Sequence, residues 1–479
     1  MKENHLKFLF WTLWSVVVSI CAYFIVHNAQ WLIGDDALVM NHTGWGKAFL
    51  PYGDLLFGAT DGRVSGRFYP FAYLQYDILL LFHHGIISPA SHFRLHAVFF
   101  IIMAFSSAVL FLGIFSDYSS NNPIWKYAIA FCAFVLMLGR AFPIYLECFT
   151  TAWGGYTYIV VFLLFSYLYV QKGKKFYAVV SLLIINYFCY CSENIFVIPV
   201  TMGICGLVFG GKDNPKKLYY WLLLGSGVLF LLLYGILVFP YIETAYDGSH
   251  GQNVSIIRVG LQMFLAQKIV IVAFLIFLVR VYDLIKKNTK FCFFDNLLLT
   301  AFGYCFGCVL LKLNFILYYT LGAIICIPVI LYFLKEYLKP YSVLAVMFVL
   351  GVFYGLKIPR AIKNNQNNRI EVADNVNRLT QSILDGNMVY WYRPLEYKDE
   401  QDPKVMGNIW LHFSMESYLK WNLRDETYKM ESMEDCDDEL KGVWLSTMEA
   451  MKLLYEKADC MTNKEKVFDV YGVVGYANE

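Results

Sequence analysis

The chain contains eleven separate apolar stretches, and these limit its fold more than any other feature. Each is 16 to 22 residues long, and a helix needs roughly 20 apolar residues to cross about 30 Å of hydrocarbon. Only 16% of the residues are charged, against about 25% in soluble domains. The sequence therefore predicts an all-α polytopic membrane protein. The expected spans are residues 8–26, 97–116, 125–142, 155–170, 176–191, 195–210, 218–239, 261–280, 294–311, 315–334 and 341–357.

The loops between these stretches predict the orientation. Residues 8–26 have the length of a signal peptide, but no small-residue cleavage site follows before Trp31, so we interpret them as a retained span. Short loops rich in lysine and arginine stay in the cytoplasm. With eleven spans, all the basic short loops lie on the side of the N-terminus. This predicts a multi-pass protein of the cell (inner) membrane with a cytoplasmic N-terminus and an extracytoplasmic C-terminus. The basic loops are 171–175, 212–217, 280–290 and 335–339.

One segment, residues 176–210, allows two interpretations. Two spans of 16 residues that meet at Ser192-Glu193-Asn194 are short, and a single broken helix is the alternative. A single helix would move the C-terminus to the cytoplasm and leave the basic loop 280–290 outside. The charge pattern therefore favours two spans.

Residues 1–357 and 358–479 are predicted to be two different domains. The first carries a net charge of +9 and the second −7. After Pro359 the long apolar stretches end, and a small extracytoplasmic α+β domain is expected. Neither part has a basic stripe suited to nucleic acid. The expected elements are a helix over 370–383, a strand over 388–392, a further element over 407–419, a solvated acidic loop over 431–439, a helix over 443–457 and a closing strand over 467–474.

Cysteine usage separates the same two domains. Ten of the twelve cysteines fall in apolar stretches, where a thiol behaves as a small hydrophobic group. Cys189 and Cys191 are two residues apart, but no Cys/His partner set follows them, so helix packing is the expected role. Cys436 and Cys460 are the only pair in the C-terminal domain. A disulfide between them is an open question that depends on an extracytoplasmic location.

The first outer loop, residues 27–96, is much longer than the others. It begins near Asp35-Asp36, continues with an aromatic, amphipathic stretch over 45–57 that is suited to the membrane surface, and then carries Arg63 and Arg67. Long ordered loops are more often functional than simple connectors.

The charged residues of this loop have a functional and a simpler interpretation. Two adjacent carboxylates repel each other, which would prepare one of them to act as a base. The simpler interpretation of Asp35 and Asp36 is a solvated helix end. Arg63 and Arg67 are spaced to share a helix face and clamp a phosphate, or to make ordinary contacts with lipid headgroups.

Glu193 is a carboxylate between two apolar stretches. A charge at mid-membrane costs about 2.5–3.5 kcal/mol, so a loop at the outer face, at the level of Asp35, is the cheaper position. Two roles remain open for Glu193: a functional one, or a structural hydrogen bond to Asn194 or to a neighbouring helix.

The order of these motifs resembles the GT-C superfamily of membrane glycosyltransferases. The resemblance rests on Asp35-Asp36 after the first span, Gly66-Arg67-Phe68 in the long first loop, and Ser192-Glu193-Asn194. It is similar to a poorly characterised bacterial group of that superfamily. It implies an inverting transfer of a sugar from a polyprenyl-phosphate carrier to an acceptor glycan, lipid or protein on the outer face, in cell-envelope polysaccharide biosynthesis.

The resemblance also implies roles for individual residues. Asp36 or Asp35 would be the catalytic base, with a slight preference for Asp36. Cations are needed at the phosphate, because negative charge grows on it as the glycosidic bond breaks. The residues expected to bind substrate are Arg67, Arg63, Glu193, Asn194 and Tyr69.

No cofactor is expected, and a divalent cation is doubtful. Metal-dependent members of the superfamily have a second acidic motif in a later outer loop, whereas residues 143–154 offer only Glu147. His92 and His96 have a spacing that suits a metal ion. Arg94 and the nearby membrane boundary favour a helix start at the interface instead.

Two rival functions make different predictions. A lipid-linked glycan polymerase or ligase should carry a large, arginine-rich late outer loop, and residues 240–260 have only Arg258. A transporter or flippase should show internal repeats and polar groups at mid-membrane. No repeat is evident, and the polar motifs gather at one interface.

Overall fold

The computed structural model describes most of the chain outside the first loop. The described residues are 3–27, 68, 70–71, 74, 88–120, 122–147, 153–211, 215–241, 255–311, 316–384, 388–397, 403–423, 430–434, 442–457, 464–470 and 472–478. Cys436 and Cys460, the pair considered for a disulfide, lie outside these residues.

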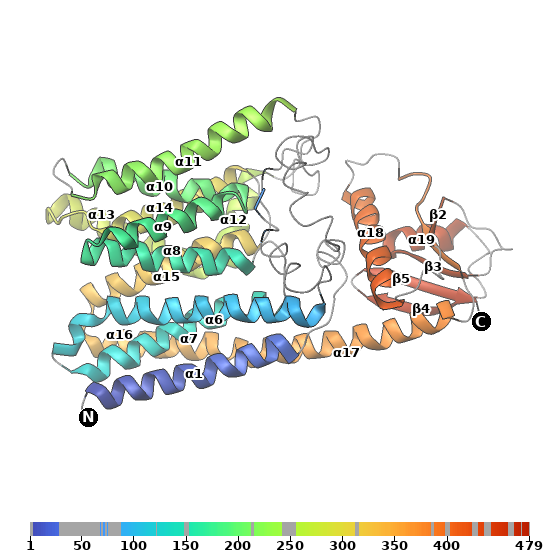
Figure 1. Ribbon diagram of the computed structural model, residues 1–479, viewed down its shortest axis with the longest axis horizontal. Coiled ribbons are helices and arrows are strands. Elements are labelled where there is room, and N and C mark those ends of the chain that lie inside the picture. Colours follow the sequence, from blue (N-terminus) through green and yellow to red (C-terminus); the bar gives the residue numbers. More distant parts are fainter. Residues whose placement is uncertain are drawn as a thin grey trace.

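All eleven predicted spans are helical, and Figure 1 shows them side by side in one bundle. Among the described residues, seven helices are long and apolar enough to cross a membrane, and one bent pair brings the number to eight. The other three spans are α8, α9 and α10, of which α9 and α10 are shorter apolar helices. The bounds are α1 Glu3–His27, α6 Pro89–Ile114, α7 Pro123–Glu147, α8 Trp153–Lys172, α9 Lys175–Cys189, α10 Val197–Phe209, α11 Lys217–Leu237, α12 Ile256–Ala266, α13 Lys268–Lys286, α14 Phe293–Leu310, α15 Ile316–Tyr337 and α16 Pro340–Gly355.

The segment with two interpretations folds as two helices. Along α9, Ser181 contacts Tyr219 of α11 and Tyr190 contacts Phe230, so α9 and α11 run in the same direction. After the short helix η3 (Glu193–Phe196), α10 runs opposite to α11. The start of α10 lies beside Phe230 of α11, and its later part lies beside Tyr220 of α11. The chain therefore reverses at residues 190–196, which supports two separate helices in this segment rather than a single broken one.

Each crossing alternates with the next, so the two termini lie at opposite ends of the bundle. Figure 1 shows the N-terminus at one end and the C-terminal sheet beyond the other. We call the latter the domain end. Residues 190–196 and the N-terminus of α6 are both at the domain end. That N-terminus is fixed by Pro89 and by a capping box between Ser88 and Ser91.

The eighth span differs from the prediction of one helix over 261–280. It is broken at Gln267 into α12 and α13, which meet at 96°. The exposed apolar side chains of α12, among them Ile257, Leu261 and Leu265, suit a helix that lies along the membrane surface.

A buried ion pair holds the opposite end of the bundle together. Arg280 of α13 donates from Nε and Nη2 to the two carboxylate oxygens of Asp295 in α14, at 2.8 Å each. Both side chains are nearly excluded from solvent. Two guanidinium nitrogens thus have a charged acceptor, and Nη1 donates to the Thr289 hydroxyl at 3.4 Å, an arrangement that makes a buried charge tolerable.

The C-terminal residues form a five-stranded sheet with helices, an α/β arrangement. The strand order is β2-β1-β3-β5-β4, with β2, β1 and β3 parallel and the β4–β5 hairpin antiparallel. Buried Trp391 and Trp444 contribute to its two cores. The elements are β1 Met388–Tyr392, α18 Pro403–Leu423, β2 Met430–Met433, β3 Gly442–Thr447, α19 Met448–Lys457, β4 Lys464–Val470 and β5 Val473–Asn478.

Three predictions for this domain were wrong in part. The expected helix over 443–457 begins with strand β3, because its first residues are a short, fully buried apolar run, whose periodicity does not separate strand from helix. The expected closing strand is a hairpin that turns at Gly472, where φ is +81°. Residues 431–433 of the expected acidic loop belong to the edge strand β2.

A single helix joins the bundle to the sheet. Helix α17 (Lys357–Leu384) begins two residues after α16 and extends into the C-terminal domain (Figure 1). Asn365 donates to the Leu146 carbonyl of α7 at 3.4 Å, and Asn375 accepts from the Asp469 amide of β4 at 3.0 Å. The helix therefore contacts both parts of the protein.

Candidate functional site

The candidate site lies where the first outer loop meets the helix bundle. Five of the predicted site residues, Asp35, Asp36, Arg63, Arg67 and Tyr69, lie outside the described residues. Their roles stay predictions. The described neighbours Phe68 and Phe71 show where the end of this motif meets the bundle.

Glu193 holds the first outer loop at the domain end. Its carboxylate oxygen Oε1 accepts a hydrogen bond from the Phe68 amide at 3.1 Å. The Phe71 amide donates to the Tyr190 carbonyl at 3.0 Å, and the Tyr187 hydroxyl donates to the Phe71 carbonyl at 3.3 Å. Phe68 and Glu193, 125 residues apart in the chain, are thus brought together, and the roles of both motifs toward substrate stay predictions.

Apolar packing completes this anchor. The Phe68 side chain is 3% exposed, and its ring lies 6.0 Å from that of Tyr190 and 5.6 Å from that of Phe230. Full burial of a phenylalanine stabilises by about 1.5–3 kcal/mol. Phe68 thus fixes the chain immediately after Arg67.

The side chain of Asn194 is used within the protein. Its Nδ2 donates to the Tyr304 hydroxyl of α14 at 2.8 Å, and its Oδ1 accepts from the Ser192 hydroxyl at 2.7 Å. Asn194 is 4% exposed. These contacts join residues 190–196, where the chain reverses, to α14. A structural role of this kind was considered for Ser192-Glu193-Asn194.

Three cations form a second cluster at the domain end, which we call the cation cluster: Arg140 of α7, Lys268 of α13 and Lys357 of α17. Arg140 and Lys357 face one aromatic ring, that of Tyr354, at 5.6 and 4.5 Å from its centroid. The positive charges of Arg140 and Lys268 both act on the charge of Lys357.

The cation cluster lacks an acidic partner. Among the described residues, no ion pair joins Arg140, Lys268 or Lys357 to a carboxylate. Like charges gathered at a membrane surface repel each other and are costly to hold without a counter-charge. An anion with more than one negative charge, such as a phosphate, would relieve that cost.

Sequence reasoning missed this cluster because each cation lies in or beside an apolar stretch. Arg140 falls within the expected span 125–142, Lys268 within 261–280 and Lys357 at the end of 341–357. A charged residue within a span is itself a signal of function, and that signal would have found Arg140.

Helix α8 lies between the loop anchor and the cation cluster. Tyr158 packs edge-to-face on Tyr187 of the anchor, with ring centroids 5.2 Å apart. Tyr156 hydrogen-bonds to Thr320 of α15. Thr320 accepts a hydrogen bond from Gln267, which in turn accepts one from Arg140. Residues two apart on a helix point in nearly opposite directions. The two groups are therefore neighbours across one helix.

The described residues offer no ready metal site. They contain no group of three or more His, Cys, Asp or Glu side chains that could hold a metal ion. His92 and His96 lie in the first two turns of α6, fully buried, with ring centroids 4.3 Å apart. This matches the expected helix start at the interface.

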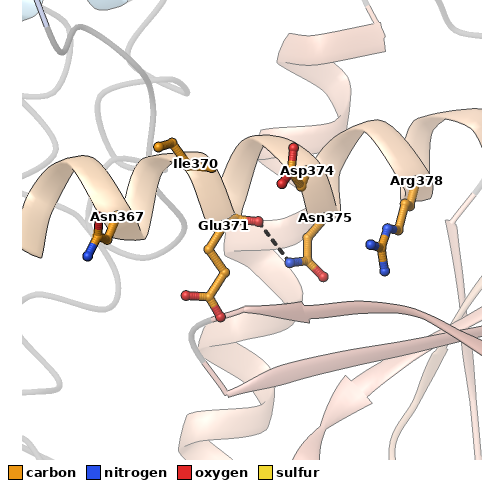
Figure 2. Close-up of a pocket in the computed structure, with 6 residues that line it drawn as sticks. All are labelled: Asn367, Ile370, Glu371, Asp374, Asn375 and Arg378. Atoms are coloured by element: carbon orange, nitrogen blue, oxygen red, sulfur yellow. Dashed lines mark hydrogen bonds between the residues drawn. The ribbon is translucent and has the colours of Figure 1, made fainter.

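An open surface cavity of about 440 Å³ lies along α17, and all of its lining residues belong to this one helix. Figure 2 shows its polar side chains on the helix, with the β-strands close by. Amide, carboxylate and guanidinium groups in one open cavity suit a ligand with many hydroxyl groups. The lining residues are Asn367, Ile370, Glu371, Asp374, Asn375 and Arg378.

This architecture defines a class of protein. Apolar helices that alternate in direction, followed by a small domain with a five-stranded sheet, make a polytopic membrane fold of the class that the sequence predicted.

A particular solved protein has this arrangement. The chain is similar to ArnT from Cupriavidus metallidurans in the apo state, with a TM-score of 0.51 and 11% identity over 98% of each chain. The structure of the same protein bound to undecaprenyl phosphate gives a TM-score of 0.52 and 11% identity over 98% of each chain. No protein-family model and no curated protein matches the sequence. At this identity the likeness concerns the fold alone.

Proposed function

We propose that this protein is an inverting glycosyltransferase that moves a sugar from a polyprenyl-phosphate carrier to an envelope glycan, lipid or protein acceptor. The observation that carries the proposal is the cation cluster, three charges without an acidic partner among the described residues, at the domain end of a GT-C fold. The similar ArnT binds undecaprenyl phosphate in one of its structures, which supports a lipid phosphate as the ligand.

The cation cluster would bind the phosphate of the carrier. When the bond between the anomeric carbon and the phosphate oxygen breaks, the electron pair stays with that oxygen and its negative charge increases. Cations already in place stabilise this charge without reorganising. Arg140 offers a planar set of donors, while Lys268 and Lys357 supply flexible point charges.

The first outer loop would supply the base. Asp36, or Asp35, would take the proton of the acceptor hydroxyl as its oxygen attacks the anomeric carbon from the face opposite the phosphate. Attack from that face inverts the anomeric centre. Arg67 and Arg63 would face the phosphate from the loop side, and Tyr69 would contact the substrate.

Glu193 has a different role in this proposal from the substrate contact first expected. Its oxygen accepts the Phe68 amide, so it would position the loop that carries Arg67. Positioning of this kind is worth a large part of a catalytic effect, because small displacements of reacting groups slow a reaction steeply.

The cavity along α17 would receive the acceptor. Its open, polar lining suits hydroxyl groups and leaves room for a large glycan. The protein would lie in the inner membrane with its N-terminus in the cytoplasm and this cavity outside, as the basic loops predict.

The test is sugar transfer by the purified full-length protein in lipid nanodiscs. The protein is incubated with a panel of polyprenyl-phosphate sugars and an envelope glycan extract, and released polyprenyl phosphate is measured. Arg140→Ala should reduce release at least tenfold. Arg258→Ala, which removes an exposed cation on α12 outside the cluster, is the matched control.

The aspartates need a separate experiment. The double variant Asp35→Asn, Asp36→Asn should abolish transfer while expression and solubility stay unchanged. Unchanged transfer would remove both residues from the mechanism. Movement of a lipid-linked sugar across the bilayer without release of polyprenyl phosphate would favour the transporter instead.

A further inference from the structure

We infer that Gln267 is a positioning residue that orients Arg140 through a neutral amide, so that the full positive charge of the cation cluster stays available to a phosphate. The inference rests on the proposed function and adds a residue that the sequence motifs did not include. Gln267 stands between α12 and α13, directly before Lys268.

The hydrogen bonds of Gln267 fix its orientation. Its carbonyl oxygen Oε1 accepts a hydrogen bond from Nη2 of Arg140. Its Nε2 donates to the Thr320 hydroxyl at 3.0 Å, and Tyr156 in turn hydrogen-bonds to Thr320. Gln267, Thr320 and Tyr156 are 1%, 3% and 0% exposed, so water does not compete for these bonds. The amide therefore presents only its carbonyl to the guanidinium.

A neutral acceptor is unusual for an arginine in such a setting, and the same chain shows the alternative. Arg280, at the opposite end of the same helix α13, is held by the carboxylate of Asp295 through two bonds of 2.8 Å. That ion pair satisfies Arg280 and cancels its charge. The amide of Gln267 orients Arg140 but does not cancel its positive charge. This suits a residue that must bind an external anion.

The remaining donors of Arg140 support this interpretation. Its Nε is buried and makes no hydrogen bond within the described part of the chain. Its guanidinium faces the Tyr354 ring, which Lys357 also faces. A buried donor without an acceptor costs about 1–3 kcal/mol, so a ligand oxygen that reached it would gain that amount.

The break in the helix adds to the positive potential. Gln267 is the residue before the first turn of α13, and the N-terminus of this helix carries a partial positive charge toward the same place. Lys268 lies in that first turn. The bend thus brings the N-terminus of α13 and the cation Lys268 together. Gln267 adds the positive charge of Arg140 by holding its guanidinium in place.

The test is Gln267→Glu, which changes the amide to a carboxylate of nearly the same shape. The new carboxylate should pair with Arg140, so the variant should be at least as stable to heat as the wild type. Binding of undecaprenyl phosphate to the full-length protein in nanodiscs should nevertheless weaken about tenfold or more, because one of three charges is lost. The salt dependence of binding should also become shallower.

Two controls keep the result specific. Gln262→Glu adds the same charge on α12 and should bind as the wild type does. Gln267→Leu removes both hydrogen bonds without adding a charge, and should weaken binding less than Gln267→Glu.

The outcomes separate the two proposals. If the wild type binds undecaprenyl phosphate and Gln267→Glu binds it equally well, Gln267 is only structural and this inference is wrong, while the proposed function stands. If the wild type binds none, both proposals fail. Weaker binding of Gln262→Glu to the same extent would also overturn the inference, because the effect would then be one of net charge.

Discussion

Removal of the Glu193 carboxylate should release the first outer loop from the bundle. In Glu193→Ala the Phe68 amide loses its acceptor at 3.1 Å, in a place where the Phe68 side chain is 3% exposed. An unsatisfied buried donor costs about 2 kcal/mol, which corresponds to roughly a 30-fold change in the ratio of attached to detached loop. Glu193→Gln keeps an oxygen acceptor and should cost only about 1 kcal/mol, roughly fivefold.

The measurement is backbone hydrogen exchange at residue resolution, with sugar transfer recorded on the same samples. Exchange at Phe68 should rise most in Glu193→Ala. Exchange at Phe71 should rise less, because its acceptor is the Tyr190 carbonyl, which the substitution leaves in place. Turnover should fall roughly in step with detachment, by about ten- to thirtyfold. Glu336→Ala, at the opposite end of the bundle, removes the same charge and serves as the control.

Two results would refute this reasoning. Unchanged exchange at Phe68 would show that Glu193 does not hold the loop. Faster exchange with undiminished transfer would show that the attached loop is not needed for the reaction. A full loss of transfer with unchanged exchange would instead return Glu193 to the substrate contact first expected.

Three further predictions follow from the charges and the sheet. Because Lys357 supplies one of the three charges of the cation cluster, Lys357→Ala should weaken phosphate binding, and Lys357→Arg, which keeps the charge, should weaken it less. Asn408→Ala should destabilise the sheet by about 2 kcal/mol in denaturant unfolding followed by tryptophan fluorescence, since it removes the acceptor of buried Trp391 Nε1 at 2.9 Å. A reporter enzyme active only outside the cytoplasm should be active when fused after the last residue, and inactivity would overturn the orientation.

The sequence predicted the bundle well because membrane crossing is a strict physical condition. An apolar stretch long enough to cross has few alternatives to a helix, and the basic loops fixed the number of crossings. It predicted the bend at Gln267 poorly, since 261–280 is apolar apart from Gln262, Gln267, Lys268 and the last residue, Arg280. A break in a helix depends on tertiary contacts, here those of Gln267 with Arg140 and Thr320.

The candidate site was predictable only in part. Glu193 was expected at the outer face on energetic grounds, and it does lie where the first loop meets the bundle. The sequence could not show that its partner is a backbone amide, because every residue but proline has one. The cation cluster draws on three helices far apart in the chain, and no local spacing relates Arg140, Lys268 and Lys357.

The C-terminal domain shows a different limit. The strand over 388–392 was correct, while 443–447 was assigned to a helix. Val443, Trp444 and Leu445 are buried from both faces of the sheet, so they lack the alternation that marks a half-exposed strand. Only their pairing with β1 and β5 decides the conformation, and that pairing is not visible in a local window.

Helix α17 has a mechanical consequence. Its 28 residues make a rod of about 42 Å, which begins with Lys357 in the cation cluster and ends beside the sheet. A rod fastened to the bundle by Asn365 and to strand β4 by Asn375 transmits a tilt of the outer domain to its own first turn. An acceptor that pulled on the sheet would thus shift an ammonium group at the membrane surface.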